Sequence, residues 1–332
     1  MKALVTGGGG FLGKRIVELL REQGHEVVFF ARGKYPDVEK LGAKGLQIDL
    51  CDAAAIPAAL DGVDVVFHVA AKAGYWGPLE AYRATNVTGT QNLIEACRAK
   101  GVKRFVYTST PSVHGYDHDI ENGGQDVPYA TSYESPYPQS KAEAEKLVLA
   151  ANGPGFATVA LRPHLIFGPG DTNLLPRVVA RARAGVLPIV GTGANKVDMT
   201  FVDNAAWAHL DAANALVSHD APCAGKAYFI GNDEPVVLWD WLGALFDDLG
   251  VPRPKRKLPL GVVRALGGVM EAAFTWLPLK GEPRMTRFLA SGLAYSHWYD
   301  MGPAKRDLGY HVRVPMAEGT RQTAAYLRGL PS

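Results

Sequence analysis

The sequence has few cysteines, almost no net charge and no long uninterrupted apolar run. Among its 332 residues the only cysteines are Cys51, Cys97 and Cys223, which are odd in number and far apart. This spacing excludes a disulfide framework and a cysteine-based metal centre, and it predicts a metal-free protein of the reducing cytoplasm. The formal charge of +2 at pH 7 gives no general field for attracting nucleic acid, so no nucleic-acid partner is expected.

The most apolar stretch, residues 258–279, does not have the pattern of a membrane span. Arg264, Glu271 and prolines interrupt it, so no spanning helix is expected there. With Phe274 and Trp276 it could form the wall or lid of an apolar substrate cleft, and an amphipathic core helix would explain the same pattern. A basic, proline-containing run precedes it at residues 253–257, which we interpret as a solvated linker.

The first half of the chain alternates short apolar runs with helical patterns. Strands are expected at residues 3–5, 26–31, 46–49, 63–69, 104–108 and 157–161, and one long helix at about 79–99. This alternation predicts an α/β fold with a doubly wound parallel sheet of the Rossmann type. Residues 201–202, the helix over 203–217 and residues 227–230 are expected to return to that sheet.

Two regions with different roles follow from this pattern. Residues 1–165, with the returning segments near 198–231, are expected to form a dinucleotide-binding domain. Residues 166–197 and 232–332 are expected to form a smaller substrate-binding domain, since their pattern is looser and richer in turns. No signal peptide is expected, because Met1 and Lys2 lead at once into a short apolar run that ends at glycines.

A glycine-rich loop separates the first strand from the first helix. Gly7, Gly10 and Gly13 have the G-x-x-G-x-x-G spacing, and this context distinguishes a dinucleotide-binding loop from a flexible one. Gly7 allows a tight turn, Gly10 allows phosphate to approach the backbone, and Gly13 allows the helix to pack on the strand. The helix start at Phe11 and Leu12 then offers free N–H groups to a pyrophosphate.

The end of the second strand bears on the choice of cofactor. Binders of NAD usually carry an acidic residue there, whereas this chain has Ala31 and Arg32, with Lys34 nearby. A guanidinium can pair with a 2′-phosphate, so the sequence predicts NADP. Asp49 and Leu50 are expected along the adenine, with Asp49 either bonding the base or capping a helix.

Tyr137 and Lys141 lie one helical turn apart and are the expected acid–base pair. Free tyrosine has a pKa of about 10, too high for efficient proton transfer at neutral pH, and a nearby ammonium would lower it. Tyr137 is therefore the expected proton donor, with Lys141 tuning it and holding the ribose. Among the hydroxyls of residues 107–113, we choose Thr110 to orient the carbonyl, with Ser109 as the alternative.

These motifs resemble the extended short-chain dehydrogenase/reductase superfamily over nearly the whole chain. The resemblance is carried by TGGGGFLG, the AA of HVAAKAG, NVTGTQNL, YTSTPSV, YPQSK and LRPHLIFGPG. It implies a homodimer paired through helices, and it assigns the acid–base tyrosine, the lysine and the hydroxyl to Tyr137, Lys141 and Thr110. It further implies that the site is shaped by Asn86 and that the cofactor is contacted by Ala70, Ala71, Lys72, Thr108 and Pro163.

A narrower resemblance is to the 3β-hydroxysteroid dehydrogenase-like branch, through NKVDMTFVDNAAWAH, GKAYFIGNDEPV and GEPRMTRF. Within it, AAKAGYWG, YTSTPSV and SHWYDMGPAKRDLGY look most like the bacterial 2-alkyl-3-oxoalkanoate reductases of long-chain olefin biosynthesis. This implies that the chain reduces a long-chain β-keto acid to its 3-hydroxy acid with NADPH. Assembly with other enzymes of the olefin pathway is left open.

Such a substrate needs an apolar cleft and a partner for its carboxylate. Lys72, His164 and Arg287 are the candidate partners, although each also has a structural interpretation, and Trp76 is a candidate for the cleft wall. A 3β-hydroxysteroid dehydrogenase is the alternative enzyme. The presence of Tyr137 and its partners argues against a non-catalytic NADPH sensor, and Ala31 argues against a nucleotide-sugar epimerase.

Overall fold

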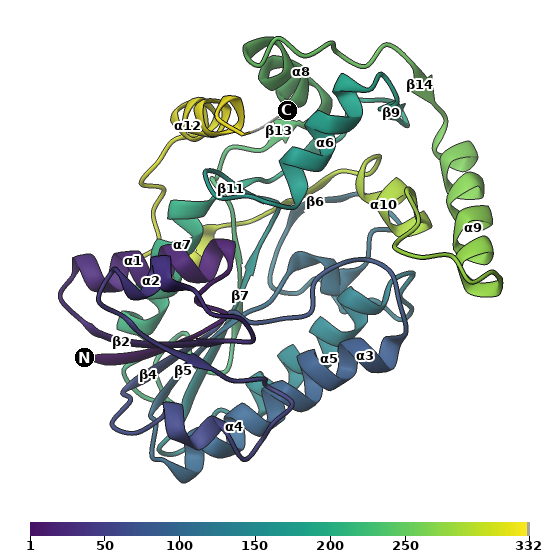
Figure 1. Ribbon diagram of the computed structural model, residues 1–332. Coiled ribbons are helices and arrows are strands. Elements are labelled where there is room, and N and C mark those ends of the chain that lie inside the picture. The colour runs from purple at the N-terminus through teal and green to yellow at the C-terminus, as the bar shows by residue number, and fades with distance from the viewer. Residues whose placement is uncertain (331–332) are drawn as a thin grey trace.

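The computed structural model describes residues 1–330 and has a central parallel sheet of seven strands. Their order is β3-β2-β1-β4-β5-β7-β12 (Figure 1). The bounds are β1 Lys2–Thr6, β2 Glu26–Ala31, β3 Lys44–Gln47, β4 Val65–His68, β5 Arg104–Thr108, β7 Ala157–Pro163 and β12 Ala227–Ile230. The strand order reverses between β1 and β4, which is where open α/β sheets bind their ligands, so the predicted Rossmann-type fold is confirmed.

Helices cover both faces of this sheet, and each face has its own hydrophobic cluster. Ala3 and Val5 of β1 join one cluster with α1 (Phe11–Glu22) and α7 (Val202–Ala215). Leu4, which points the other way, joins a second cluster with α4 (Gly89–Ala99) and α5 (Pro136–Ala150). Successive strand residues thus face opposite layers, which is why these strands are apolar along their whole length.

The expected long helix over residues 79–99 is present, with a wide turn in its middle. α3 (Leu79–Arg83) passes through a π-helical segment, Ala84–Thr88, directly into α4. Single π turns of this kind are rare and frequently occur at functional sites. This one carries Asn86, which is buried.

A smaller region lies above the carboxyl ends of the central strands (Figure 1). Its sheet has the order β13-β10-β15-β6, built from β6 (Ile120–Gly123), β10 (Lys196–Val197), β13 (Val236–Val237) and β15 (His297–Tyr299). Around this sheet lie α6 (Leu174–Arg183), α8 (Leu238–Asp248) and α10 (Arg287–Gly292). Since β6 comes from the first half of the chain, the two regions share this sheet, and the exact domain boundaries remain a prediction.

Two expectations for residues 166–217 were wrong. Phe201 does not return to the central sheet, because β11 (Thr200–Phe201) pairs with β8 (Ile166–Phe167) in a separate two-stranded sheet. Residues 174–183, expected to be irregular, form the helix α6. The remaining elements are α2 (Pro36–Glu39), α11 (Gly302–Leu308), α12 (Met316–Arg328), β9 (Ile189–Val190), β14 (Lys257–Leu258) and 3-10 turns at Ile56–Ala59 and Pro111–His114.

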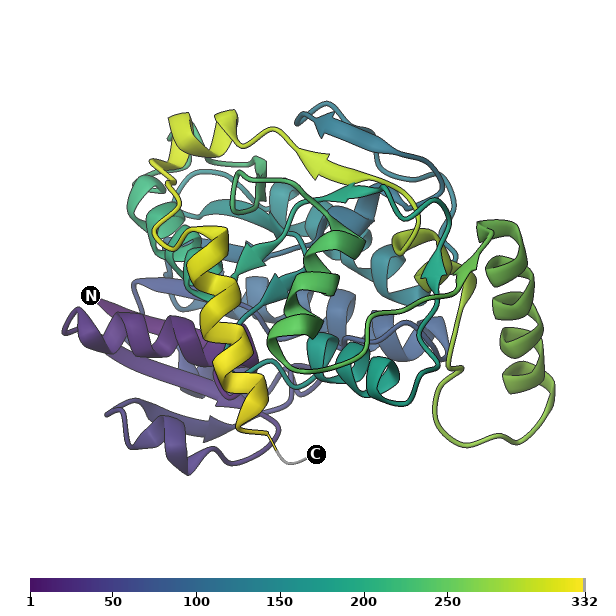
Figure 2. The ribbon, with the colours of Figure 1, turned by 90° about the horizontal axis from the view of Figure 1, so that it is seen from above.

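Residues 260–276 form α9 (Leu260–Trp276), which stands at the edge of the molecule in both views (Figures 1 and 2). Only Val263, Gly267 and Glu271 of this helix are buried, so it is not a core helix. No α9 residue lines either of the two cavities described below. The helix therefore does not form the cleft wall that the sequence suggested. Within residues 1–330, we find no helix with both the length and the apolar character that crossing a bilayer requires.

Candidate active site

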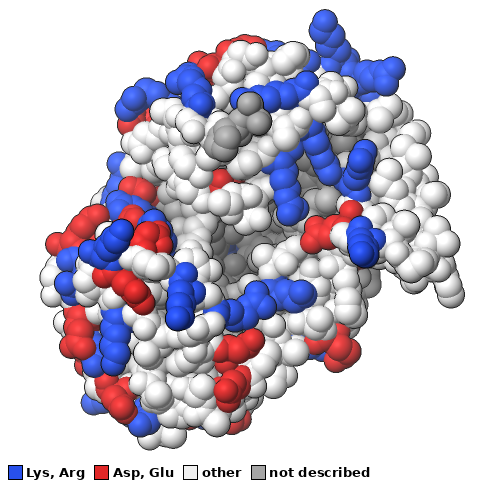
Figure 3. All heavy atoms as spheres, viewed as in Figure 1, with Lys and Arg blue, Asp and Glu red and all other residues white. Residues whose placement is uncertain are grey.

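A cavity of about 340 Å³ opens at the carboxyl ends of β5 and β7. Thr108, Ser109 and Thr110 line it from the end of β5, Pro163 and His164 from the end of β7, and Tyr137 from the first turn of α5. In the space-filling view a hollow lies near the middle of this face, between the central sheet and the smaller region (Figure 3). The structure therefore brings the predicted tyrosine, hydroxyls and proline to one cavity.

Lys141 and Tyr137 are both buried on α5, but the expected effect of one on the other is absent. The Lys141 ammonium donates a hydrogen bond to the Thr108 carbonyl (2.6 Å) and lies 4.1 Å from the centre of the Tyr107 ring. Burial lowers the pKa of Lys141 to about 7. Burial also raises the pKa of Tyr137, and the neighbouring Tyr75 raises it further. The phenol is therefore held neutral, because burial disfavours the charged phenolate.

Three hydroxyls from the segment after β5 line the cavity beside Tyr137. Thr110 caps the Pro111–His114 turn: its Oγ1 accepts from the Ser112 N–H (3.3 Å) and lies 3.0 Å from Ser112 Oγ. Ser109 Oγ is buried and forms no hydrogen bond of ordinary geometry among the described residues, although the Glu145 carboxylate lies near it. A buried hydroxyl without a partner is costly unless a ligand supplies one, so Ser109 is as strong a candidate as Thr110.

Asn86 connects the loop after β4, which contains Lys72, to the start of α5, which contains Ser140. Its Oδ1 accepts from the Lys72 N–H (2.7 Å), and its Nδ2 donates to the Lys72 carbonyl (3.1 Å) and to Ser140 Oγ (2.9 Å). Ser140 in turn donates to the Tyr137 carbonyl (2.9 Å). Asn86 therefore positions the start of α5 through other residues and makes its contacts from the π turn.

The glycine loop fits a dinucleotide pyrophosphate. Gly7 has φ +70°, and a side chain at Gly13 would begin 2.2 Å from the Gly7 oxygen, so both positions require glycine. Above Gly10 the space is open, since a Cβ there would meet only that oxygen at 3.3 Å. Gly10 is the N-cap of α1 and supplies no side-chain cap, which leaves the N–H groups of Phe11 and Leu12 available to phosphate oxygens.

Beside the glycine loop lies a buried hydrogen-bond network that the sequence did not reveal. Thr6 Oγ1 accepts from the N–H groups of Val69 (3.1 Å) and Ala70 (3.0 Å) and contacts His68 Nδ1 (2.8 Å). His68 Nε2 lies 2.9 Å from Thr90 Oγ1, which donates to the Asn86 carbonyl (2.6 Å). Burial lowers the pKa of His68 to about 3, so it stays neutral. The network ties β1, β4 and the π turn together beneath Ala70 and Ala71.

The adenosine side of the site contains Arg32 and Asp49 at the ends of β2 and β3. Arg32 is exposed and makes no side-chain ion pair within the described chain, so its guanidinium can meet a phosphate. Asp49 is exposed, and its Oδ1 accepts from the Cys51 N–H (2.9 Å), which is a local capping contact. Leu50 is buried against Gly89 of α4. Tyr35, which the sequence did not single out, packs against Gly9.

His164 lines the cavity as a neutral imidazole. Its Nδ1 donates to the Asp198 carbonyl (2.8 Å), and the Tyr116 hydroxyl lies 3.2 Å from its Nε2. Burial lowers the pKa of His164 to about 4. It therefore offers no positive charge at neutral pH, and the role drawn from the sequence, a cationic partner for a carboxylate, does not fit its surroundings.

Unlike His164, the other two cations proposed for the substrate are not among the residues that line the first cavity. Lys72 lies over the Tyr82 ring at 5.1 Å. Arg287 is exposed and pairs with Glu271 (2.7 Å). Trp76, in contrast, lines a second apolar cavity of about 310 Å³, together with two arginines that the sequence did not single out, Arg177 and Arg181.

The two cavities meet along a common wall. Six residues line both: Tyr75, Leu174, Val178, Leu242, Leu289 and Leu293. These come from the loop after β4, from α6, from α8, and from α10 with the residue that follows it. Sequence reasoning missed them because no local signal shows that segments so far apart meet. Only the four-residue spacing of Leu174 and Val178 is visible locally, and it indicates that these two side chains share one side of a helix.

Comparison with known proteins identifies the family of the chain. The sequence profile of the 3-beta hydroxysteroid dehydrogenase/isomerase family matches residues 4–260. A protein of Stenotrophomonas maltophilia named 2-alkyl-3-oxoalkanoate reductase is 49% identical over 98% of this chain and 99% of its own. One of the same name from Shewanella oneidensis is 44% identical over 98% and 86%. A mouse sterol-4-alpha-carboxylate 3-dehydrogenase, decarboxylating, is 36% identical over 97% and 90%.

Solved structures show the same architecture. MoeE5 in complex with UDP-glucose and NAD is 26% identical, with a TM-score of 0.75 over 99% of both chains. The crystal structure of gox2253 is 27% identical, with a TM-score of 0.78 over 98% of this chain and 97% of the other. The fold, the glycine loop and these neighbours together support a nicotinamide cofactor.

Proposed function

Because the chain belongs to the 3-beta hydroxysteroid dehydrogenase/isomerase family within the extended short-chain dehydrogenases/reductases, we propose that it reduces the 3-oxo group of a 2-alkyl-3-oxoalkanoate, a long-chain β-keto acid. The product would be the 3-hydroxy acid, and the electron donor NADPH. The single observation that carries this proposal is the pair of apolar cavities that meet beside Tyr137. A 2-alkyl-3-oxo acid has two alkyl arms that diverge near its ketone, which matches two cavities with a common wall.

The reaction follows from what the buried residues do. The bound cofactor supplies hydride to the carbonyl carbon. Tyr137, whose pKa is raised by burial, holds its proton until negative charge develops on the substrate oxygen, and then donates it from Oη. Ser109 or Thr110 donates a second hydrogen bond to the same oxygen. The Lys141 ammonium, in the same buried site, stabilises the phenolate that remains.

The carboxylate of the substrate would be held without a full positive charge. No Lys or Arg side chain is among the described residues that line the first cavity, whereas hydroxyls of Ser112 and Tyr116 are. We therefore propose that these hydroxyls, rather than Lys72, His164 or Arg287, bind the carboxylate. Arg177 and Arg181 line only the second cavity.

The cofactor proposal, NADP rather than NAD, is supported by the end of β2. Arg32 is exposed there and Ala31 leaves no carboxylate to bind a 2′-hydroxyl. We expect kcat/KM with NADPH to exceed that with NADH, and we expect Arg32→Gln to lower the NADPH value about 10- to 100-fold while changing the NADH value little. Steady-state kinetics with both cofactors measures this. A wild-type preference for NADH would contradict the proposal.

A 3β-hydroxysteroid dehydrogenase is the second candidate, favoured by the names of several relatives. Besides the mouse protein, an Arabidopsis thaliana 3beta-hydroxysteroid-dehydrogenase/decarboxylase isoform 2 is 37% identical over 96% of this chain and 61% of its own. As its name describes, the sterol-4-alpha-carboxylate enzyme acts on a carbon adjacent to the one that carries a carboxylate. A 2-alkyl-3-oxo acid has the same relation between its two groups.

A substrate panel separates these functions. NADPH oxidation would be followed with a 2-alkyl-3-oxo acid, an unbranched 3-oxo acid and a 3-oxosteroid, and the corresponding alcohols would be oxidised with NADP. We expect the 2-alkyl-3-oxo acid to have the highest kcat/KM, and Tyr137→Phe to lower kcat about 10²- to 10⁴-fold while NADPH still binds. A preference for the steroid would favour the second candidate. Undiminished turnover by Tyr137→Phe would exclude the mechanism above.

The setting of this reaction is proposed from resemblance alone. We propose that the chain acts as a homodimer in long-chain olefin biosynthesis, beside the enzymes that make the keto acid and consume the hydroxy acid. Light scattering on the purified protein tests whether it is a homodimer. Co-purification with the enzymes that make the keto acid and consume the hydroxy acid tests whether it assembles with them.

A further inference from the structure

The outer face of α9 is an apolar surface that the fold leaves uncovered. Nine large hydrophobic side chains are exposed among the described residues, and six of them lie between residues 262 and 279: Val262, Leu266, Val269, Trp276, Leu277 and Leu279. Trp276 is 84% exposed and Val269 68%. Four of the six lie on α9, and Leu277 and Leu279 lie directly after it. Isolated exposed hydrophobic residues are ordinary on proteins, but such a group on one helix and the residues that follow it marks a contact surface.

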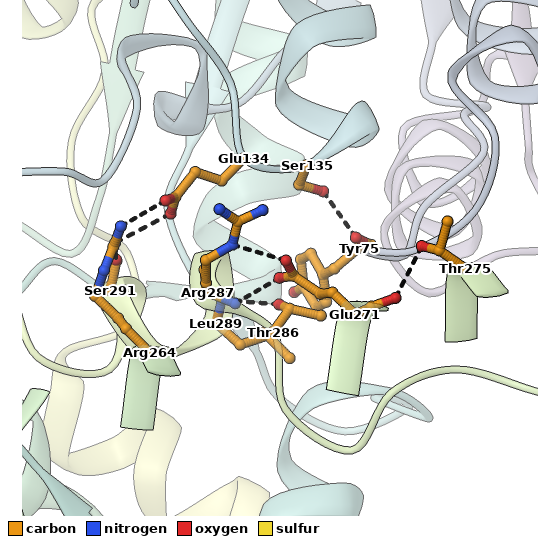
Figure 4. Close-up of polar contacts among 10 residues, drawn as sticks. All are labelled: Tyr75, Glu134, Ser135, Arg264, Glu271, Thr275, Thr286, Arg287, Leu289 and Ser291. Atoms are coloured by element: carbon orange, nitrogen blue, oxygen red, sulfur yellow. Dashed lines mark hydrogen bonds and ion pairs between the residues drawn. The ribbon is translucent and has the colours of Figure 1, made fainter. Parts of the chain in front are cut away.

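Polar contacts fasten α9 to the body of the protein by its inner side (Figure 4). The Glu271 carboxylate accepts from the Arg287 N–H and from its Nε, each at 2.7 Å. Arg264 donates to both carboxylate oxygens of Glu134, at 3.1 and 2.6 Å, and to Ser291 Oγ. These bonds reach α10 and the loop before α5, so the helix is attached at two places along its length.

The attached side is narrow, and the apolar side points away from it. Val263, Gly267 and Glu271 are spaced four residues apart and form the buried stripe. At Gly267 a Cβ would lie 2.8 Å from the Thr286 carbonyl carbon, so the backbones of α9 and the start of α10 approach closely there. At 3.6 residues per turn, Val269 and Trp276 project from the opposite side. The contacts therefore keep the apolar side turned outward.

The segments on both sides of α9 are basic. Arg253, Lys255, Arg256 and Lys257 come before it, and no Asp or Glu occurs between residues 249 and 270. Lys280 and Arg284 come after it, with one acidic residue, Glu282, between them. Of these, only Arg253 forms an ion pair within the described chain, with Asp247. In Figure 3 the surface at the place of α9 is free of charged atoms, and Lys and Arg atoms protrude above it. This combination complements a surface that is apolar inside and negatively charged outside.

We propose that α9 is an interfacial helix that docks the protein on an anionic phospholipid surface. The apolar side chains around Val269 would enter the region between headgroups and acyl chains, and the flanking lysines and arginines would meet lipid phosphates. Trp276, at the end of the helix, has the amphipathic ring that is enriched at this depth of a bilayer. A protein partner could bury the same apolar side, but basic residues at both ends favour lipid.

The docking surface adjoins the second cavity. Trp76 lines that cavity, and its ring contacts the ring of Phe274 on α9 at 6.4 Å between centroids. Glu282 and Pro283, in the segment after α9, line the same cavity. A docked molecule would thus hold this cavity next to the lipid, where an apolar substrate concentrates. The proposal concerns binding to the surface and does not depend on which ketone is reduced.

Flotation with phospholipid vesicles tests the proposal on the full-length protein. The wild type should float with vesicles of phosphatidylcholine mixed with phosphatidylglycerol, more weakly with phosphatidylcholine alone, and less as salt rises. Val269→Gln with Trp276→Gln should lower partitioning about tenfold or more on both kinds of vesicle. Replacing Lys255, Arg256 and Lys257 by glutamine should weaken binding to the anionic vesicles only.

The control replaces two exposed hydrophobic residues elsewhere by glutamine, Val186→Gln with Val217→Gln, and should bind vesicles as the wild type does. The α9 variant should keep the thermal unfolding midpoint of the wild type within a few degrees, which shows that it is folded. Three outcomes would overturn the proposal: a wild type that stays unbound, an α9 variant that binds equally well, or an α9 variant whose mass by light scattering drops to a smaller oligomer. The last would identify this surface as an interface between copies of the chain.

Discussion

At the scale of single residues, burial of the Lys141 ammonium lowers the stability of the fold at the site where the proposed reaction needs a positive charge. Its ammonium is buried, and burial lowers its pKa to about 7. An ammonium held in such a place costs free energy of folding, because only one short hydrogen bond, to the Thr108 carbonyl, replaces its hydration. In the proposed mechanism this charge is needed because the reaction leaves a phenolate on Tyr137.

Replacing this lysine should therefore separate activity from stability. We expect Lys141→Met to lower kcat about 10²-fold or more, while the midpoint of thermal unfolding stays the same or rises. In the wild type, kcat/KM for reduction should decline as the pH rises above about 7, because Lys141 loses its proton there. Kinetics and thermal unfolding across pH measure both effects.

Lys146→Met is the control, since this lysine lies on the same helix and is exposed. It should change neither kcat nor the pH profile. Lower thermal stability of Lys141→Met than of this control would contradict the explanation from burial, and an unchanged profile above pH 7 would contradict the assigned charge.

The spacing of Tyr137 and Lys141 could be read from the sequence, but the sign of the shift in the pKa of Tyr137 could not. Spacing places both residues on one side of α5, where a charge–charge argument predicts a lower pKa. The observed shift is upward because desolvation by burial is the largest cause. Burial depends on segments far away in the chain, and spacing carries no information about them.

At the scale of helices and strands, local patterns predicted the central sheet well. β2 and β5 have the expected bounds, because each is an apolar run that ends at a polar or turn-forming residue. β3 lies two residues earlier than expected. α6 was missed because residues 166–197 show a looser, turn-rich pattern, and the helical spacing within residues 174–183 is too short to stand out from it.

The π turn at Ala84–Thr88 is the element that local patterns could not reveal. An ordinary α-helix over the same residues has nearly the same pattern of buried positions. Its wider turn matters because Asn86, within it, reaches both the Lys72 backbone and Ser140. One side chain of the π turn thus connects the loop after β4 to α5.

At the scale of the whole molecule, buried neutral histidines should make the fold sensitive to acid. Burial lowers the pKa to about 3 for His68, to about 4 for His114, His164 and His209, and well below the usual value for His297. In the unfolded chain the pKa is about 6.5, so the unfolded state takes up protons first as the pH falls. The stability that the neutral histidines contribute is therefore complete above pH 6.5 and is lost progressively between about 6.5 and 4.

This loss begins at a higher pH than carboxylates alone would cause. Each such histidine costs on the order of 1–3 kcal/mol by pH 4. Asp198 acts in the opposite direction, since burial raises its pKa to about 7, but it is one group against five. We expect the thermal midpoint to fall steadily from pH 6.5 to 5, as scanning calorimetry would measure.

His209→Gln should make this fall less steep. The amide can keep the contacts of His209 with the Thr108 hydroxyl and the Ala205 carbonyl, yet it takes up no proton. His118→Gln, at an exposed histidine, is the control and should leave the slope unchanged. A thermal midpoint that stays constant down to pH 5 would show that the buried imidazoles do not govern acid stability.

The common wall between the two cavities also bears on the stereochemistry of the product. The two cavities differ in their lining: the first carries hydroxyls and the second carries two arginines. The two alkyl arms of the substrate, one on the carbon between ketone and carboxylate and one on the ketone carbon, would then fit the two cavities in only one orientation, with a single side of the ketone turned toward the hydride donor. Of the four stereoisomers that two adjacent chiral carbons allow, such a protein would release one.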